Sequence, residues 1–332
     1  MRAKHPDVVA VTVTYGDRFD LLARVAGPVL ASPGLVRWVV VTNGVHARIA
    51  QKIAALDARV MLRSFATNTG SAPAYADGIA TALETGADFV WLLDDDNLPD
   101  ADALARLIEA QASLTRNDSE PWRTAVCAFR PHKPAQFADG VDRRMPSSFL
   151  GFHARQWLGR RALRSCATAA SCTSAALASA PYGGLLLPMR LLRETGLPDP
   201  QFVLYADDTE FTDRIIRRGG RLRLVAAAHI ADISPSWQGG RRLRDAWLDE
   251  ASEARVFYGA RNEAWFDFHR LMANRWLYRF HRAIVLAAWW CASRREPRRR
   301  RFTLLVEAIH AGEAGRLGVD ARFPLETAAD AE

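Results

Sequence analysis

The stretch that decides the fold reads FVWLLDDD and spans residues 89–96. Five consecutive apolar residues predict a fully buried strand, and turn-forming residues follow the three carboxylates directly. In an open α/β sheet, ligands bind outside the carboxyl ends of the strands, which is where this triplet is expected. Three adjacent like charges repel, so a cation should neutralise them, and a hard divalent ion such as Mg²⁺ suits oxygen ligands. The alternative is a solvated acidic turn at the start of the next helix.

Strands and helices alternate on both sides of this stretch. Apolar, β-branched segments predict strands at residues 8–14, 35–42 and 60–64, and amphipathic segments predict helices at 19–31, 47–56 and 73–85. The alternation indicates an α/β protein with a mostly parallel sheet flanked by helices. Further strands are expected at 126–129, 184–187 and 222–227, and further helices at 101–110 and 210–218. Residues 143–180 give no clear pattern, and their Ala/Ser-rich part at 167–180 fits a mobile loop and an ordinary helix equally well. The pattern becomes helical after about Trp237.

Length and composition agree with one globular α/β domain that carries an appendage. The chain has 332 residues, of which 49% are hydrophobic and 24% charged. We expect a catalytic domain over residues 1–245 and a helical extension over residues 246–332. The four cysteines lack CxxC spacing, so neither a zinc site nor a disulfide framework is expected, and a reducing cytosol is the default. The chain enters a strand almost at once, so no signal peptide is expected.

The net charge of +7 is concentrated near the C-terminus. Arg294, Arg295 and the run Arg298 to Arg301 follow an apolar stretch at residues 283–292, which contains Trp289 and Trp290. The stretch is too short to span a bilayer as a helix, but paired tryptophans beside arginines suit the surface of an anionic membrane. The alternative is a buried helix followed by a solvated basic loop. Nucleic-acid binding is not expected, because the basic run lacks a binding motif.

Eight short blocks follow one another in a familiar order, at residues 13–18, 41–44, 68–72, 91–96, 182–186, 202–211, 226–230 and 258–262. They include an aspartate-rich triplet, a glycine pair before an apolar strand, an acidic block and an Arg-Asn dipeptide. Together they resemble the inverting glycosyltransferases of family two, which have the GT-A fold. Within that family the chain looks most like the bacterial rhamnosyl- and galactofuranosyl-transferase branches. The resemblance covers roughly residues 7 to 265.

The resemblance implies a metal ion that stabilises the negative charge of the leaving nucleotide diphosphate. An inverting transfer needs the diphosphate stabilised, the acceptor hydroxyl deprotonated and both held in line across the anomeric carbon. Mn²⁺ or Mg²⁺ would act as the electrophile. By their positions in the family's motifs, Asp94 and Asp96 are the expected ligands of this metal ion, and His229 is the expected third ligand. The alternative is that His229 only packs in the core or caps a turn. Asp95 would instead bond the ribose or hold the loop.

The resemblance also implies the catalytic base. Asp208 is the expected base, and Asp207 is the runner-up, which would orient the acceptor. Two neighbouring carboxylates in a partly buried site push one pKa upward, which brings a general base nearer the working pH. Glu210 is the next choice, because many relatives carry Glu-Asp-x-Asp where this chain has Asp-Asp-Thr-Glu at 207–210. The same acids also suit the N-terminus of the helix at 210–218.

The nucleotide sugar is expected at the ends of the first two strands and on three loops. The backbone of residues 14–16 would form hydrogen bonds with a uracil or thymine ring, and residue 17 or 43 would contact the ring or the ribose. Residues 68 and 70 would contact the diphosphate or the base. Residues 183 and 184 would contact the sugar. A tryptophan on a glycine-hinged loop would stack on the sugar. The expected contacts are Thr14, Tyr15, Gly16, Asp17, Asn43, Asn68, Gly70, Gly183, Gly184 and Trp237. No Gly-rich phosphate loop follows any strand, which counts against NAD and ATP chemistry.

These expectations combine into one function. We expect a metal-dependent inverting glycosyltransferase that moves a sugar from a UDP- or dTDP-sugar to a hydroxyl of a glycan or polyprenyl-linked acceptor. It would serve cell-envelope polysaccharide synthesis from the inner face of the plasma membrane, as a peripheral cytoplasmic protein. One alternative is a nucleotidyltransferase-like enzyme, which normally needs a longer Gly-rich loop than residues 15–18 supply. The other is a catalytically inactive, membrane-associated protein that binds sugar nucleotides. The residues leave the donor sugar, the acceptor and the oligomeric state open.

Overall fold

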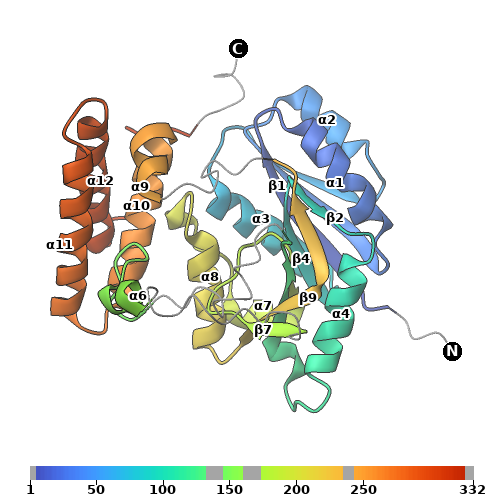
Figure 1. Cartoon of the computed structure of the whole chain (residues 1–332). Helices are drawn as coiled ribbons and strands as arrows, with labels where there is room; N and C mark the ends of the chain where they lie inside the picture. The colour runs from blue at the N-terminus through green and yellow to red at the C-terminus, as the bar shows by residue number, and fades with distance from the viewer. Residues whose placement is uncertain (1–4, 132–144, 160–172, 235–242, 326–332) are drawn as a thin grey trace.

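The computed structural model describes residues 5–131, 145–159, 173–234 and 243–325. A central β-sheet carries helices on both faces, and a bundle of C-terminal helices stands beside it (Figure 1). The strands are β1 (Val8–Tyr15), β2 (Leu35–Asn43), β3 (Val60–Phe65), β4 (Phe89–Asp94), β5 (Asn97–Pro99), β6 (Thr124–Phe129), β7 (Ser174–Ala176), β8 (Leu185–Pro188) and β9 (Arg221–Asp232). The helices around the sheet are α1 (Phe19–Ala31), α2 (Ala47–Ala54), α3 (Ser71–Leu83), α4 (Ala103–Leu114), α7 (Met189–Thr195) and α8 (Asp207–Arg217).

The strand order is β3-β2-β1-β4-β8-β6-β9-β5, and β7 pairs with β9 beside this path. The first four strands are parallel, as the alternation of strands and helices predicts. The other half is mixed: β8 runs antiparallel to β4 and β6, β5 and β7 run antiparallel to β9, and β6 and β9 are parallel.

Both faces of the sheet are buried, which explains the nearly continuous apolar runs of the strands. Successive side chains of a strand point to opposite faces. Val90 and Leu92 of β4 therefore join the core under α3, α7 and α8, whereas Trp91 and Leu93 join the core under α1, α2 and α4. The same alternation sends the carboxylate of Asp94 to the α3 side of the sheet.

The C-terminal helices form a third apolar core. They are α9 (Leu243–Asp245), the π-helical turn η4 (Ala246–Glu250), α10 (Glu253–Phe266), the π-helical turn η5 (Asp267–Leu271), α11 (Arg275–Ala292) and α12 (Arg298–Glu313), and the short helix α6 (Ala154–Gly159) lies beside them. Their core includes Phe149, Tyr258, Tyr278, Trp289 and Leu305. Helix α10 lies between the sheet and helices α11 and α12 (Figure 1). In the described ranges, every helix is too short or too polar to span a membrane.

Candidate active site

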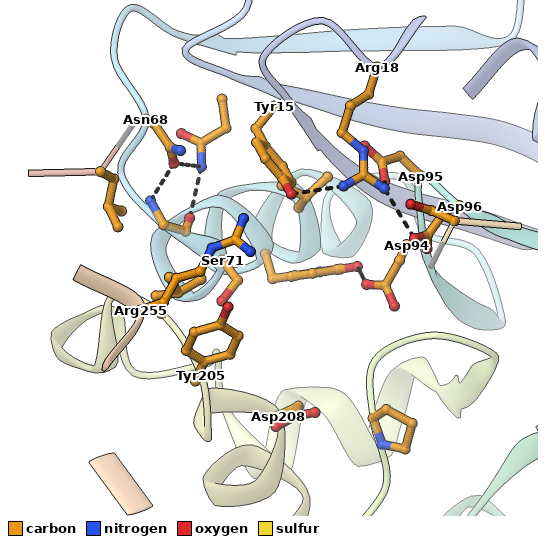
Figure 2. A pocket seen from close by; sticks show the side chains of 18 of the residues that line it. Tyr15, Arg18, Asn68, Ser71, Asp94, Asp95, Asp96, Tyr205, Asp208 and Arg255 are labelled. Carbon is orange, nitrogen blue, oxygen red and sulfur yellow. Dashed lines mark hydrogen bonds and ion pairs between the residues drawn. The ribbon is translucent and has the colours of Figure 1, made fainter. Parts of the chain in front are cut away.

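A cavity of about 570 Å³ opens where strands β1, β2 and β4 end. The sheet supplies one wall, and the loop before α8 together with the start of α10 supplies the other (Figure 2). Of the residues expected from the sequence, eight line this cavity: Tyr15, Asn43, Asn68, Gly70, Asp94, Asp95, Asp96 and Asp208. The structure thus brings both acidic clusters, more than a hundred residues apart in the chain, to one space.

Asp94 is the last residue of β4 and lies on the cavity wall next to α3. The hydroxyl of Tyr75 in α3 donates a hydrogen bond of 2.7 Å to its Oδ1 atom. Its backbone N–H donates to Oδ1 of Asn97, 3.0 Å away, which closes the turn after the strand. Burial raises the pKa of Asp94, and the hydrogen bond from Tyr75 and the charge of Arg130 oppose this rise. A carboxylate in this position therefore favours a cation in the cavity.

Arg18, at the start of α1, already neutralises part of the triplet. Its guanidinium lies 3.0 Å from Asp95 and 3.1 Å from Asp96. Asp95 also accepts a hydrogen bond of 2.8 Å from the hydroxyl of Thr14, a buried residue that does not line the cavity. Burial raises the pKa of Asp95 to about 7, although Arg18 and Thr14 favour its charged form. Through these contacts, Asp95 connects β1 to the acidic loop at residues 94–96.

A fourth carboxylate, Asp232 at the end of β9, lines the same cavity. The buried Arg130 donates to its Oδ1 atom at 2.9 Å, and Asn97 donates to the same atom at 3.1 Å. None of these three residues was expected at the site from the sequence. The feature that identified residues 94–96, a charged side chain at the end of an apolar strand, could also have pointed to two of them. Arg130 follows β6 directly, and Asp232 is the last residue of β9.

His229 does not reach the cavity wall. Strand β9 continues past the predicted end at residue 227 to Asp232, so His229 lies within the strand. Its Nδ1 atom is 3.2 Å from a carboxylate oxygen of Asp100, its Nε2 atom is 2.8 Å from the carbonyl oxygen of Ala226, and its side chain is 39% exposed. The structure thus separates His229 from Asp94 and Asp96.

Asp94 and Asp96 fit a divalent ion that draws its other ligands from substrate. Within the described residues, no group of three His, Cys, Asp or Glu side chains is arranged to hold a metal. Mg²⁺, however, is commonly bound by one or two carboxylates, with water and substrate phosphates completing its shell. Two hard oxygen donors on a cavity wall meet that requirement. Arg18 pairs with both Asp95 and Asp96, but Asp95 is buried and also accepts a hydrogen bond from Thr14, which leaves it less suited to a metal than Asp96.

The two acids that begin α8 have different surroundings. Asp208 lines the cavity opposite Asp94 (Figure 2), and the N–H of Thr209 donates to its Oδ1 atom at 2.6 Å. Asp207 is buried and accepts a hydrogen bond of 3.1 Å from the hydroxyl of Ser71. Burial raises the pKa of both, and the charge of Asp208 raises that of Asp207 further. Glu210 is bound to Arg214 and Arg270 and does not line the cavity.

The loop before Asp207 is strained. Val203, Tyr205 and Ala206 have φ angles of 64°, 70° and 57°, in the left-handed region that non-glycine residues rarely adopt. The buried amide of Asn262 in α10 donates to the carbonyl oxygens of Phe202, Leu204 and Tyr205 at 2.6, 2.9 and 2.9 Å. Such strain persists only where surrounding structure enforces it.

The Arg-Asn dipeptide of the helical extension therefore holds the loop that presents Asp208. Arg261 adds a hydrogen bond of 3.2 Å from its guanidinium to the carbonyl of Phe202. The resemblance noted in the sequence included this dipeptide but assigned it no role.

The other expected nucleotide contacts divide into three groups. Asn43 and Asn68 bind each other at 3.1 Å and shape the loop before α3, with Asn43 also donating to the carbonyl of Gly70 at 2.9 Å. Gly16, the exposed Asp17 and the glycines 183 and 184 are not among the lining residues. A Cβ atom at Gly183 would lie only 2.7 Å from Oδ2 of Asp94, so glycine is needed beside the acids. Trp237 lies outside the described residues.

Comparison with known proteins supports the fold and the reaction class. No protein-family model matches the chain. The galactofuranosyltransferase GlfT1 of Mycolicibacterium smegmatis is homologous, with 25% identity over 320 residues that cover 90% of this chain and 99% of that protein. GlfT1 of Mycobacterium tuberculosis is 28% identical over 153 residues, which are 46% of this chain and 45% of that protein.

Among solved structures, that of GalNAc-T7 with UDP, GalNAc and Mn²⁺ superimposes with a TM-score of 0.50 and 13% identity. The match covers 86% of this chain and 58% of that one. The architecture is the GT-A fold of glycosyltransferases, as the resemblance implies. At this identity the structural likeness speaks for the fold alone.

We expect Asn262→Ala to lower the free energy of unfolding by about 2–3 kcal/mol, because it leaves three backbone carbonyls without their donor. Urea denaturation measures this loss. The matched change Asn117→Ala, at an exposed asparagine, should stay within about 0.5 kcal/mol of the parent protein. Equal losses for the two variants would contradict the role of Asn262.

Proposed function

We propose that the protein is a metal-dependent inverting glycosyltransferase that uses a UDP- or dTDP-sugar and a hydroxyl acceptor on a glycan or lipid-linked molecule. One observation carries the proposal: Asp94 and Asp96 face Asp208 across a single cavity in a GT-A fold. The homology to galactofuranosyltransferases over nearly the whole chain supports glycosyl transfer. The UDP and Mn²⁺ named for the GalNAc-T7 structure support a uridine nucleotide and a divalent ion.

The residues of the cavity suit the two halves of an in-line displacement. Asp94 and Asp96 would hold Mg²⁺ or Mn²⁺, which supplies positive charge to the departing diphosphate. From the other wall, Asp208 accepts the proton of the acceptor hydroxyl. The acceptor oxygen then forms its bond to the anomeric carbon as the bond from that carbon to the diphosphate oxygen breaks. Attack from the wall opposite the leaving group inverts the anomeric configuration.

The surroundings of Asp208 suit a general base. The N–H of Thr209 occupies Oδ1, which leaves Oδ2 for the acceptor. Burial raises the pKa of Asp208, so its carboxylate binds a proton more strongly than an exposed aspartate does. Asp207 is engaged with Ser71 and supports the start of α8. This arrangement favours Asp208 over Asp207 and Glu210 as the base.

The surface of α11 supports a peripheral membrane location for the same enzyme. Trp276, Phe280, Ile284 and Trp290 are 78%, 54%, 37% and 55% exposed and share one face of the helix. The alanines at 283 and 287 continue this face, so the exposed stripe carries no charge. Large exposed apolar patches mark interaction surfaces, and exposed aromatic residues suit the interface between lipid and water. Of the two adjacent tryptophans expected at a membrane surface, Trp290 lies on this stripe, whereas Trp289 is buried in the core of the C-terminal helices.

Arginines border this stripe. The guanidinium groups of Arg279 and Arg294 lie over the rings of Trp276 and Trp290, at 5.6 and 4.9 Å from the ring centres. Within the basic run, Arg298 and Arg300 are engaged with Asp249 and Glu253. The exposed arginines would attract anionic lipid headgroups. We place the enzyme at the inner face of the plasma membrane, where a lipid-linked acceptor for cell-envelope polysaccharide would be reached.

Asp208→Asn should lower the rate of sugar transfer about 10²- to 10⁴-fold, because the base is lost, while binding of the nucleotide sugar is retained. Transfer is measured with radiolabelled donors and binding by calorimetry. Asp213→Asn, on the same helix but outside the cavity, is the control and should retain the parent rate.

The pH dependence of the parent enzyme tests the same assignment. The base works only when deprotonated, so the rate should fall as the pH drops through the raised pKa of Asp208, well above the ordinary aspartate value of about 4. Equal rates for the parent and Asp208→Asn would show that the base is another group.

Removal of divalent ions with EDTA should abolish transfer, and added Mn²⁺ or Mg²⁺ should restore it. Asp96→Asn removes a charged oxygen ligand, so it should raise the Mn²⁺ concentration needed for half-maximal activity at least tenfold. Asp102→Asn, at an exposed acid near the start of α4, provides the control. Full activity in EDTA would contradict the metal assignment.

Trp276→Ser with Phe280→Ser should release the protein from vesicles that contain phosphatidylglycerol, because both side chains lie on the exposed stripe. Co-sedimentation measures the bound fraction, and vesicles of phosphatidylcholine alone should bind the parent protein less. Val319→Ser, at an apolar residue that is 78% exposed outside α11, should change nothing. Unchanged binding of the double variant would exclude α11 as the contact surface.

A further inference from the structure

The helical extension contributes directly to the cavity. Ser252, Ala254 and Arg255, at the start of α10, are lining residues together with the ends of β1 and β4. From the sequence, residues 246–332 were expected to form a helical extension outside the catalytic domain. The structure makes the beginning of α10 part of the wall that faces the acidic strand ends.

A balance of charges in the cavity singles out Arg255. The lining residues include three arginines, at positions 18, 130 and 255. Arg18 is paired with Asp95 and Asp96, and Arg130 is paired with Asp232. In the part of the chain that the structure describes, Arg255 forms no ion pair, although Asp208 lines the same cavity.

The position of Arg255 makes the lack of an acidic partner among the described residues significant. The residue is half-buried. Figure 2 shows Arg255 on the side of the cavity where Asn68, Ser71 and Tyr205 also lie, away from the cluster Asp94 to Asp96. None of these three neighbours is an acid. A guanidinium that is partly removed from water without a partner loses hydration and gains nothing in exchange, so an anionic ligand is favoured there. Its planar array of donors matches the oxygens of a phosphate group.

We propose that Arg255 binds a phosphate group of substrate, so that the helical extension supplies an anion contact that the sheet does not. The proposal rests on the proposed function, in which both substrates can carry phosphate: the nucleotide sugar through its diphosphate, and a lipid-linked acceptor through its phosphate linkage. The acids at the end of β4 attract a cation, and Arg255 attracts an anion at another part of the same space. A substrate that bridges them is held at two points, which fixes its orientation relative to Asp208.

Calorimetric titration of the full chain in the presence of Mn²⁺ tests this, with UDP, uridine and inorganic pyrophosphate as probes. Arg255→Met removes the charge but keeps much of the side-chain length. It should weaken binding of UDP and pyrophosphate about 10- to 100-fold and leave the binding of uridine unchanged. Arg255→Lys should recover part of the loss, because a point charge remains without the planar array. Arg316→Met, at an exposed arginine outside the cavity, is the matched control.

A second arm distinguishes the source of the phosphate. If Arg255→Met leaves UDP binding intact but raises the KM of a polyprenyl-phosphate-linked acceptor and not that of a neutral glycan, the phosphate belongs to the acceptor. Either pattern supports the proposal. If Arg255→Met behaves like Arg316→Met in both arms, the proposal is overturned while the glycosyltransferase assignment stands. If the parent protein binds neither UDP nor pyrophosphate and transfers no sugar, the proposed function fails, and the phosphate contact fails with it.

Discussion

The site depends on the neutralisation of negative charge at the ends of buried strands. Asp94, Asp95, Asp96 and Asp232 lie close together where water is partly excluded, and burial, together with the charges of neighbouring acids, raises the pKa of Asp94 and Asp95. Arg18 and Arg130 offset this repulsion by pairing with three of the four acids. The charge that they leave uncompensated is what makes the cavity receptive to a divalent ion. The proposed metal binding and the stability of the acidic loop therefore depend on the same electrostatic balance.

The helical extension after residue 245 packs beside the sheet and also forms part of the cavity wall. Asn262 and Arg261 of α10 hold a loop with three non-glycine residues in the left-handed region, and that loop leads into Asp208. The same helix places Arg255 on the cavity wall. The predicted boundary near residue 245 separates the α/β elements from the C-terminal helices along the chain. Residues from both sides of this boundary line the cavity. A further surface of the extension, along α11, offers the apolar stripe proposed to meet the membrane.

The sequence predicted the elements better than the partners of each side chain. The helix at residues 19–31 was predicted with its observed bounds, and β1 to β4 were each predicted to within two residues, because buried parallel strands have a strong apolar signature. His229 shows the limit. A strand predicted to end at residue 227 would leave this side chain at a strand end, but β9 continues for five more residues, so His229 pairs with Asp100 instead. Strand ends depend on pairing with neighbours, and β5 supplies the pairing that extends β9 to Asp232.

The sequence by itself determined which strands are buried, that acids follow them, and that these acids belong to a recognisable order of blocks. These features are local, because a run of apolar residues and the charges beside it are set by neighbours in the chain. Only the tertiary structure decided that Arg18, Arg130 and Asp232 share the acidic cluster and that Asp208 rather than Asp207 faces the cavity. It also decided that Arg255 lies on the cavity wall with no ion pair to any described residue. Those facts depend on distances between residues far apart in the chain, and such distances are set by how the sheet and the helical extension pack together.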